Sequence, residues 1–455
     1  MTTAATTATT AMQRRLLWAA ILAAFVSFLD GSIVNIALPA IERDFGGGVV
    51  VQQWVVDGYL LTLSALILAA GAVSDAFGRL RVLRIAVVAF TVTSLVCALA
   101  PTAGLLIAAR VLQGVAGALL VPGSLALIVA TFQGAAQSAA IGRWTGWTSV
   151  SFLAGPVAGG VFVDAIGWRW VFVLGALPAA GALLLLGRIA DGQRDGPRPR
   201  VDVTGAALAA LGLAGLTAAL IEAHLGLTDP RVLAALIGGA VSLAAFLIRD
   251  ARSTAPLVPL ELFRRGNFAA GNAATLFLYA GVGLATLIPT VFLQEVVHLT
   301  AFQAALTALP ATVLSIVLSG RFGALAGRYG PRLFMTLGPI VASAGFALMT
   351  FSSGDRGALW FVVPGTVLFG LGFSATVAPL TSAVLGAVPA IQSGIGSAVN
   401  NAIARVAGLV ATACAGLILG LHVDVGGFHR GVLVIAVLLV LGGIVSAIGV
   451  RNPLR

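Results

Sequence analysis

The chain has 455 residues, of which 59% are hydrophobic and only 9% are charged. Soluble domains carry about 25% charged residues, so this composition excludes a soluble globular protein and indicates one embedded in a membrane. All 26 basic residues are arginines, and the formal net charge is +10. Because the arginines form no continuous stripe, we attribute them to membrane topology and do not expect a nucleic-acid partner.

Apolar stretches of about 18–25 residues, the length that crosses a hydrocarbon core of roughly 30 Å, recur along the whole chain. They predict an all-α polytopic membrane protein with fourteen spans. The approximate ranges are 16–39, 53–73, 82–100, 104–131, 139–163, 168–188, 203–223, 231–249, 268–293, 302–325, 333–352, 358–383, 397–420 and 430–450. Residues 1–15 precede them as an expected disordered cytoplasmic tail, and Arg14 and Arg15 favour a retained signal anchor.

The arginines predict the orientation of these spans. With the N-terminus inside, nineteen arginines fall in cytoplasmic segments, five fall in outer segments, and Arg110 and Arg405 fall within spans. Cytoplasmic loops of membrane proteins are enriched in Lys and Arg, so this asymmetry places both termini in the cytoplasm.

An internal repeat divides the chain into halves. GAVSDAFGRLRVL begins at Gly71 and GALAGRYGPRLFM at Gly323, and each follows the second span of its half. Six spans plus six, with an inserted pair between them, account for the fourteen. We therefore expect an N-terminal bundle (16–190), a cytoplasmic linker (191–202), two extra helices (203–250), an amphipathic cytoplasmic linker (251–267), a C-terminal bundle (268–450) and a cytoplasmic tail (451–455).

A carboxylate and an arginine lie at membrane depth in the first half. Asp30 is about fourteen residues into the outward-running first span, and Arg110 about six residues into the inward-running fourth, so the two side chains could meet. An adjacent Arg favours a charged carboxylate, whereas desolvation favours a neutral one, which is what a proton carrier requires. The alternatives are an Asp30 that bends or caps its helix and an Arg110 that snorkels to the outer interface.

Several other polar or aromatic residues are candidates. Asp57 lies near the outer end of the second span and is either a second proton site or an interfacial residue. Asn400, Asn401 and Arg405 could line a cavity or form an interhelical hydrogen-bond network. Further candidates for the substrate cavity are Asn35, Gln113, Trp147 and Tyr279, although packing also explains the aromatic side chains. The two cysteines and four histidines show no metal or redox spacing, so no metal or cofactor is expected.

Two motifs resemble the major facilitator superfamily. GAVSDAFGR is similar to its loop between the second and third spans, which implies a conformational latch formed by Gly71, Asp75, Gly78 and Arg79. The second copy has Gly327 in place of Asp75, so the latch should be asymmetric; the alternative is an ordinary charged turn. ARVLQG, with Arg110, Gln113 and the following glycine, resembles the fourth-span motif R-x-x-Q-G.

Further motifs resemble one branch of that superfamily, the fourteen-span drug–proton antiporters. SFLAGPVAGG is similar to the antiporter motif G-x-x-x-G-P-x-x-G-G, with Gly155, Pro156, Gly159 and Gly160 matched and Ser151 in place of the first glycine. LDGSIVNIALP, WVVDGYLL and SAVNNAIARVAG resemble the first, second and thirteenth spans of this branch. Small-residue packing alone is the alternative explanation of the glycines.

The resemblance implies a bacterial plasma-membrane exporter with the major facilitator fold. It would exchange protons for lipophilic drugs or other small molecules by alternating access, as a monomer in contact with membrane lipid. The thirteenth span has no acidic residue, so neutral or weakly charged compounds are expected in place of dications. The alternatives are a dedicated exporter of one metabolite or self-made antibiotic, and an uncoupled facilitator. The sequence contains no group of catalytic nucleophile residues and no phosphate-binding loop, so an enzyme is not expected.

Overall fold

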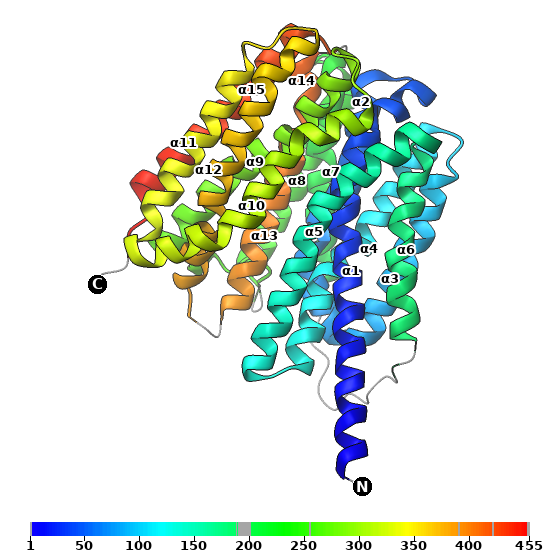
Figure 1. Cartoon of the computed structure of the whole chain (residues 1–455), viewed down its shortest axis with the longest axis vertical. Helices are drawn as coiled ribbons and strands as arrows, with labels where there is room; N and C mark the ends of the chain where they lie inside the picture. Colours follow the sequence, from blue (N-terminus) through cyan, green and yellow to red (C-terminus); the bar gives the residue numbers. More distant parts are fainter. Residues whose placement is uncertain are drawn as a thin grey trace.

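The computed structural model (Figure 1) describes residues 2–187, 189, 202–253, 256–389, 392–420 and 423–452. Within these ranges the chain is helical apart from short connections and contains no strand. Fourteen helical segments are long and apolar enough to cross a membrane, which confirms the predicted number of spans.

The N-terminal bundle contains the first six spans. α1 packs against α4, α5 and α6, while α3 packs against α4 and α6. Runs of alanine allow these close approaches: Ala19, Ala20, Ala23 and Ala24 of α1 are all 0% exposed. The helices are α1 (Thr2–Phe45), α2 (Gly48–Phe77), α3 (Arg79–Ala98), α4 (Ala103–Thr131), α5 (Gly134–Ile166) and α6 (Arg169–Leu186).

The first helix is longer than the sequence predicted. α1 begins at Thr2, so residues 2–15, expected as a disordered tail, are helical and extend below the bundle (Figure 1). The segment contains no glycine or proline before the first span and has four alanines, the residue with the highest helix propensity. Its polarity identified a segment outside the membrane, and polarity alone does not prevent a helix.

The C-terminal bundle repeats this arrangement. It consists of α9 (Gly266–Glu295), α10 (Ala301–Tyr329), α11 (Pro331–Met349), α12 (Leu359–Gly386), α13 (Ser393–Ala413), its short continuation α14 (Ala415–Leu419) and α15 (Val425–Gly449). The internal repeat has the same turn in both bundles. Gly78 after α2 has φ 93° and Gly330 after α10 has φ 87°, a backbone region that side chains with a Cβ rarely adopt.

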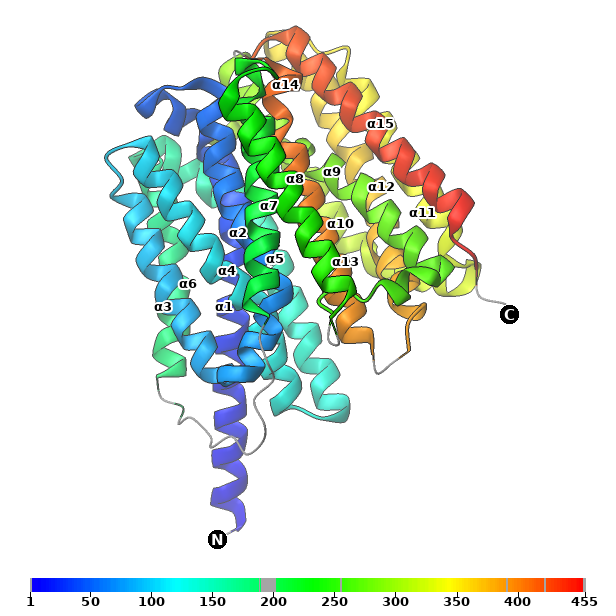
Figure 2. The same ribbon diagram turned by 180° about the vertical axis from the view of Figure 1, so that it is seen from behind.

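The two inserted helices lie in front of the junction of the bundles in Figure 2. α7 (Val203–Ile221) and α8 (Pro230–Ala251) form a tight hairpin, in which Gly215 lies directly against Gly239. α7 contacts both α2 and α13, and Leu213 packs with Leu61 and Leu409 from the two bundles. The inserted pair is therefore attached to both bundles.

Polar connections anchor the ends of this hairpin. At the cytoplasmic end, Asp202 caps α7 by accepting a hydrogen bond from the Gly205 amide and also pairs with Arg249 of α8 at 2.9 Å. The hydrogen bond from Arg249 holds the pKa of the Asp202 carboxyl below its usual value. At the outer end, Trp54 Nε1 of α2 donates to Glu222 at 3.0 Å.

The predicted connecting segments are described only in part. Of the linker 191–202 only Asp202 is described, and residues 453–455 of the tail are likewise outside the described part. Within 251–267, the structure contains the short 3-10 helix η2 (Leu260–Arg264), with Leu262 buried. Asp250 of α8 accepts hydrogen bonds from the amides of residues 257 and 258, which fixes the path of the chain into the C-terminal bundle.

Hydrogen bonds join the outer ends of the two bundles. Asp164 at the end of α5 accepts from the amides of Ala301 and Phe302 at the start of α10, at 3.0 and 2.9 Å. Nearby, Gln294 donates to the Ile36 carbonyl and Gln52 to Glu295. We call these contacts the outer seal. A helix N-terminus favours a carboxylate, so Asp164 is a suitable acceptor there.

The outer seal depends on Gly160, which generates a first prediction. A Cβ at Gly160 would lie 2.5 Å from the Cα of Phe302, whereas a Cβ at Gly146, on the same helix, would meet no atom within 4 Å. Gly160→Ala should therefore push α5 away from α10 and shift the protein toward a state with separated outer ends, while Gly146→Ala should not.

Spin labels at Arg43 and Arg356, both exposed on the outer side of opposite bundles, would measure this separation by pulsed electron resonance. Cys97 and Cys414 are the two cysteines and would be replaced first. An unchanged distance distribution in Gly160→Ala would show that the contact does not hold the outer ends together.

Candidate proton and substrate site

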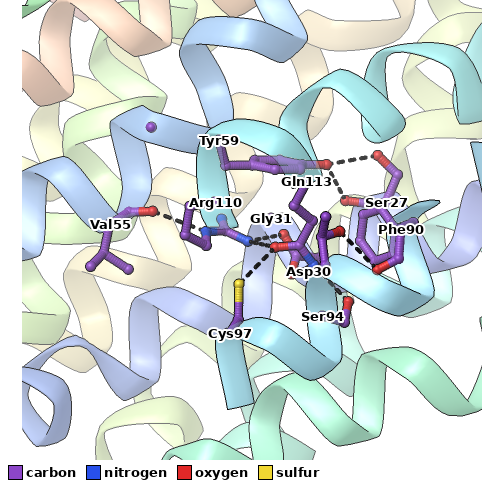
Figure 3. A network of polar contacts seen from close by, with 12 residues as sticks. Ser27, Asp30, Gly31, Val55, Tyr59, Phe90, Ser94, Cys97, Arg110 and Gln113 are labelled. Carbon is purple, nitrogen blue, oxygen red and sulfur yellow. Dashed lines mark hydrogen bonds and ion pairs between the residues drawn. The ribbon is translucent and has the colours of Figure 1, made fainter. Parts of the chain in front are cut away.

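A buried ion pair lies inside the N-terminal bundle, as the depths of the two residues predicted. Asp30 of α1 and Arg110 of α4 are 3% and 1% exposed, and Arg110 Nη1 donates to Asp30 Oδ2 at 2.7 Å. Figure 3 shows the two side chains pointing toward one another. Arg110 therefore does not snorkel to the outer interface, and Asp30 lies inside α1 and does not cap a helix end.

The polar groups around the pair form hydrogen bonds with one another and with the backbone of the same bundle. Arg110 Nε donates to the Val55 carbonyl at 3.0 Å, and its guanidinium carbon lies 4.4 Å from the centre of the Tyr59 ring. Gln113 donates to Asp30 at 3.2 Å and to Ser94 at 2.7 Å, and accepts from Arg110 at 2.6 Å. Gln113 is 0% exposed, so the structure places this predicted cavity residue within the ion-pair network.

The R-x-x-Q-G spacing explains how the pair is held. Arg110 and Gln113 are three residues apart and project from the same face of α4. The glycine that follows, Gly114, lies against the Tyr59 carbonyl of α2, where a Cβ would collide with the backbone. This close approach of α4 to α2 brings Val55 and Tyr59 to the arginine.

Asp57 occupies a separate place, between the bundles. It is 0% exposed, and Thr412 of α13 donates a hydrogen bond to its Oδ1. One turn earlier, Gln53 donates to the Thr412 and Ala413 carbonyls at 2.9 and 2.8 Å, at the break between α13 and α14. Asp57 Oδ2 and Gln53 Oε1 accept no hydrogen bond from the described residues. Asp57 is thus buried at the junction of the two bundles and is not exposed on the protein surface.

The predicted latch residues lie at the cytoplasmic end of α2. Gly71 is exposed within the helix, Gly78 forms the turn, and Arg79 donates to the Ala126 carbonyl of α4 at 3.2 Å. The side chain of Asp75 is outside the described part of the structure. The contact shown for Arg79 is therefore one within the N-terminal bundle.

The glycines of the predicted antiporter motif form the contact face of α5. Gly155 lies against Ser32 and Gly159 against Ile33, both on α1, while Gly160 lies against Phe302 of α10. Pro156 is inside the helix. One face of α5 is therefore shared between the two bundles.

The other cavity candidates separate into two groups. Asn35 and Asn401 donate to carbonyls of their own helices, and Asn400 donates to Asn272 and Thr275 of α9 at 3.0 and 2.8 Å. Asn400 is thus part of an interhelical hydrogen-bond network, one of the two alternatives that the sequence left open.

The second group is aromatic or charged. Trp147 is 45% exposed and packs edge-on against Trp18, and Tyr279 packs against Phe373. The guanidinium carbon of Arg405 lies 5.7 Å from the centre of the Phe28 ring, across the bundle boundary.

Several residues of these sites were not predicted. Ser94, Gln53, Thr412 and Phe28 have no charge or motif that distinguishes them in the sequence. Phe28 is only two residues before Asp30, which was the one available signal.

Comparisons with known proteins agree with this arrangement. The sequence model of the Major Facilitator Superfamily matches residues 20–412. The chain belongs to the major facilitator superfamily. It is 34% identical over 397 residues to the multidrug resistance protein Stp of Mycobacterium tuberculosis (strain CDC 1551 / Oshkosh), covering 87% of this chain and 74% of that protein. It is therefore a multi-pass protein of the bacterial plasma membrane.

Two other relatives and one solved structure extend the comparison. The tetracenomycin C resistance and export protein of Streptomyces glaucescens is 31% identical, over 87% of this chain and 74% of that protein. The multidrug efflux pump LfrA of Mycolicibacterium smegmatis is 33% identical, over 86% and 77%. A D-xylose–proton symporter has a TM-score of 0.69 at 15% identity, covering 96% of this chain and 98% of that one, which shows the shared fold.

The buried pair generates a second prediction. Arg110→Leu leaves the Asp30 carboxylate buried without its partner, and breaking a buried pair in this way costs about 3–5 kcal/mol of stability. Adding Asp30→Asn removes the uncompensated charge, so the double variant should be more stable than the single one. Thermal unfolding in detergent, followed by tryptophan fluorescence, shows which of the two variants unfolds at the higher temperature.

The matched control is Arg169→Leu, which breaks the pair between Arg169 and Asp44 at 2.6 Å, where both side chains are more than 40% exposed. An exposed pair contributes roughly 0–1 kcal/mol, so its loss should change the unfolding temperature little. A double variant no more stable than Arg110→Leu would contradict the interpretation of the pair as a compensated buried charge.

Proposed function

We propose that this protein exports small lipophilic molecules from the cell in exchange for protons. The observation that carries the proposal is the Asp30–Arg110 pair, a titratable group buried at membrane depth in a protein of a transporter family. Ionisable residues within membrane spans are costly, and they mark ion pathways and proton relays. The export and drug-resistance names of the relatives support the direction and the kind of cargo.

The proton is carried by Asp30 in this proposal. Beside Arg110 the carboxylate is stabilised in its charged form, and separation from the guanidinium without access to water would favour its neutral form. A rocking motion that changes the contact between α1 and α4 therefore changes proton affinity. Arg110 retains Gln113 and the Val55 carbonyl when the proton binds, so its charge is not left without partners.

Asp57 is the second proton site in this proposal. Its carboxyl is buried between α2 and α13, with one oxygen that accepts no hydrogen bond from the described residues. If Asp57 were protonated, its neutral carboxyl group would have an O–H that can donate a hydrogen bond at this place. Because Thr412 belongs to the other bundle, protonation at Asp57 would affect how the two bundles hold together.

Alternating access uses the remaining motifs. The outer seal closes the cavity to the outside, and the glycine face of α5 lets the two bundles slide against one another. The residues Gly71, Asp75, Gly78 and Arg79 act as the cytoplasmic latch when the cavity opens outward. The protein works as a monomer surrounded by lipid and is not an enzyme.

A dedicated exporter of one compound is the second candidate function. It is favoured by the relative whose name specifies tetracenomycin C, whereas the Stp and LfrA names favour a multidrug pump. The number of unrelated compounds that drive proton movement separates the two.

The test is substrate-triggered proton movement in proteoliposomes, read by a trapped pH-sensitive dye across a panel of lipophilic dyes and antibiotics. Several compounds should drive proton flux in the wild type, and Asp30→Asn should reduce the flux at least tenfold. Glu42→Gln is the matched control, since this carboxylate lies on the same helix near its outer end and should not be needed.

Three outcomes would change the proposal. Flux with a single compound indicates the dedicated exporter. Full coupling in Asp30→Asn transfers the proton-carrying role to Asp57. No flux with any compound, together with binding of several, indicates an uncoupled facilitator.

A further inference from the structure

Arg405 is a cation at membrane depth that forms no ion pair with the residues the structure describes. It lies in the middle of α13, ten residues after the start and fourteen before the end of the span Ile395–Leu419, and it is partly exposed. Among the residues that the structure describes it forms no ion pair, in contrast to Arg110, which is neutralised by Asp30. Its described contact is with the ring of Phe28 in the other bundle, at 5.7 Å. A charge at this depth normally has a partner or lines a cavity.

The ring that contacts this guanidinium belongs to an aromatic cluster in the N-terminal bundle. The Phe28 ring of α1 lies 5.4 Å from the ring of Phe152 and 6.5 Å from that of Trp144, both on α5. None of the three is fully buried, and Phe152 is 48% exposed. Through Phe28, the guanidinium on α13 therefore contacts a cluster of three rings that belong to α1 and α5 of the other bundle.

The surrounding charges leave this place positive. From residue 266 to the end, the chain has only three acidic residues, Glu295, Asp355 and Asp424. All three lie in or next to outer connections, at the end of α9, before α12 and before α15. In the N-terminal bundle, Asp30 is bonded to Arg110 and Asp57 to Thr412. Among the described residues, no carboxylate forms an ion pair with Arg405.

We propose that the transported molecule is an amphipathic aromatic anion, which this site binds between Arg405 and the rings of Phe28, Trp144 and Phe152. A carboxylate or phenolate suits the fork of N–H donors of a guanidinium, and the fused rings of such a molecule would stack on the aromatic cluster. Arg405 is then a specificity-determining residue, and it disfavours the organic cations that a carboxylate-lined cavity would select. This inference rests on the proposed function, because it specifies the cargo of the same cavity.

The probes are fluorescein and rhodamine 123, which share a xanthene ring system and differ in charge: at pH 8 the first is an anion and the second a cation. The purified full-length protein in lipid nanodiscs is titrated into each dye, without any proton gradient, and fluorescence anisotropy gives the Kd after subtraction of empty nanodiscs. The wild type should bind fluorescein at least tenfold more tightly than rhodamine 123.

Variants assign the effect to the guanidinium. Arg405→Gln should weaken fluorescein binding at least tenfold and leave rhodamine 123 unchanged or bound more tightly. Arg405→Lys keeps the charge but loses the fork of donors, so it should weaken fluorescein binding less than Arg405→Gln does. Arg356→Gln, an exposed arginine of the outer side of the same bundle, is the control for loss of a positive charge elsewhere.

Three results would overturn the proposal: no binding of fluorescein to the wild type, equal or tighter binding of rhodamine 123, or an unchanged fluorescein Kd in Arg405→Gln. If Arg405→Gln does not give a monodisperse protein, Phe28→Leu tests the aromatic side of the site and should weaken both dyes. Because the titration uses no gradient, failure of proton-coupled export in proteoliposomes would leave a positive binding result intact, and the two failures remain distinguishable.

Discussion

A carboxylate and a guanidinium that are 2.7 Å apart at membrane depth must obtain every hydrogen bond from the protein, because the bilayer core supplies none. Each neighbour of Asp30 and Arg110 follows from that requirement. Gln113 bridges both side chains and reaches Ser94, the Val55 carbonyl accepts from Nε, and the Tyr59 ring covers the guanidinium. The same requirement makes the pair sensitive to motion, since any change in the packing of α1 on α4 alters the balance between the charged and the neutral carboxyl.

Glycine determines how closely the helices around this pair can approach. Gly114 lets α4 touch the backbone of α2, and the glycines of α5 let that helix lie on α1 and, at Gly160, on α10 of the other bundle. Without a hydrophobic driving force between helices in lipid, such close contacts and interhelical hydrogen bonds provide much of the association. The polar network and the small-residue faces therefore act together. They hold α1, α4 and α5 close enough to fix the positions of Asp30 and Arg110.

The sequence predicted the features that depend on span length, charge depth and repeated glycine turns. It placed fourteen spans, related the turns at Gly78 and Gly330, and brought Asp30 to Arg110, because each of these follows from counting residues along helices of known rise. It could not predict contacts that depend on how each helix is rotated about its own axis. The bond from Thr412 to Asp57, the position of Phe28 against Arg405 and the membership of Gln113 in the ion-pair network all depend on helix rotation, which hydropathy does not fix. The helical start of α1 was missed because a polar sequence was interpreted as a disordered one.

The position of α7 has a consequence for how lipid meets this protein. A molecule that diffuses within the bilayer can approach the boundary of the bundles from two sides, one flanked by α2 and α13 and the other by α5 and α10. On the first side α7 stands between the lipid and the boundary, with Leu213 packed on Leu61 and Leu409. On the second side α5 lies directly on α10, with Gly160 against Phe302. Among the described helices, the inserted hairpin therefore separates one side of the boundary from the lipid, whereas on the other side only the contact between α5 and α10 does so.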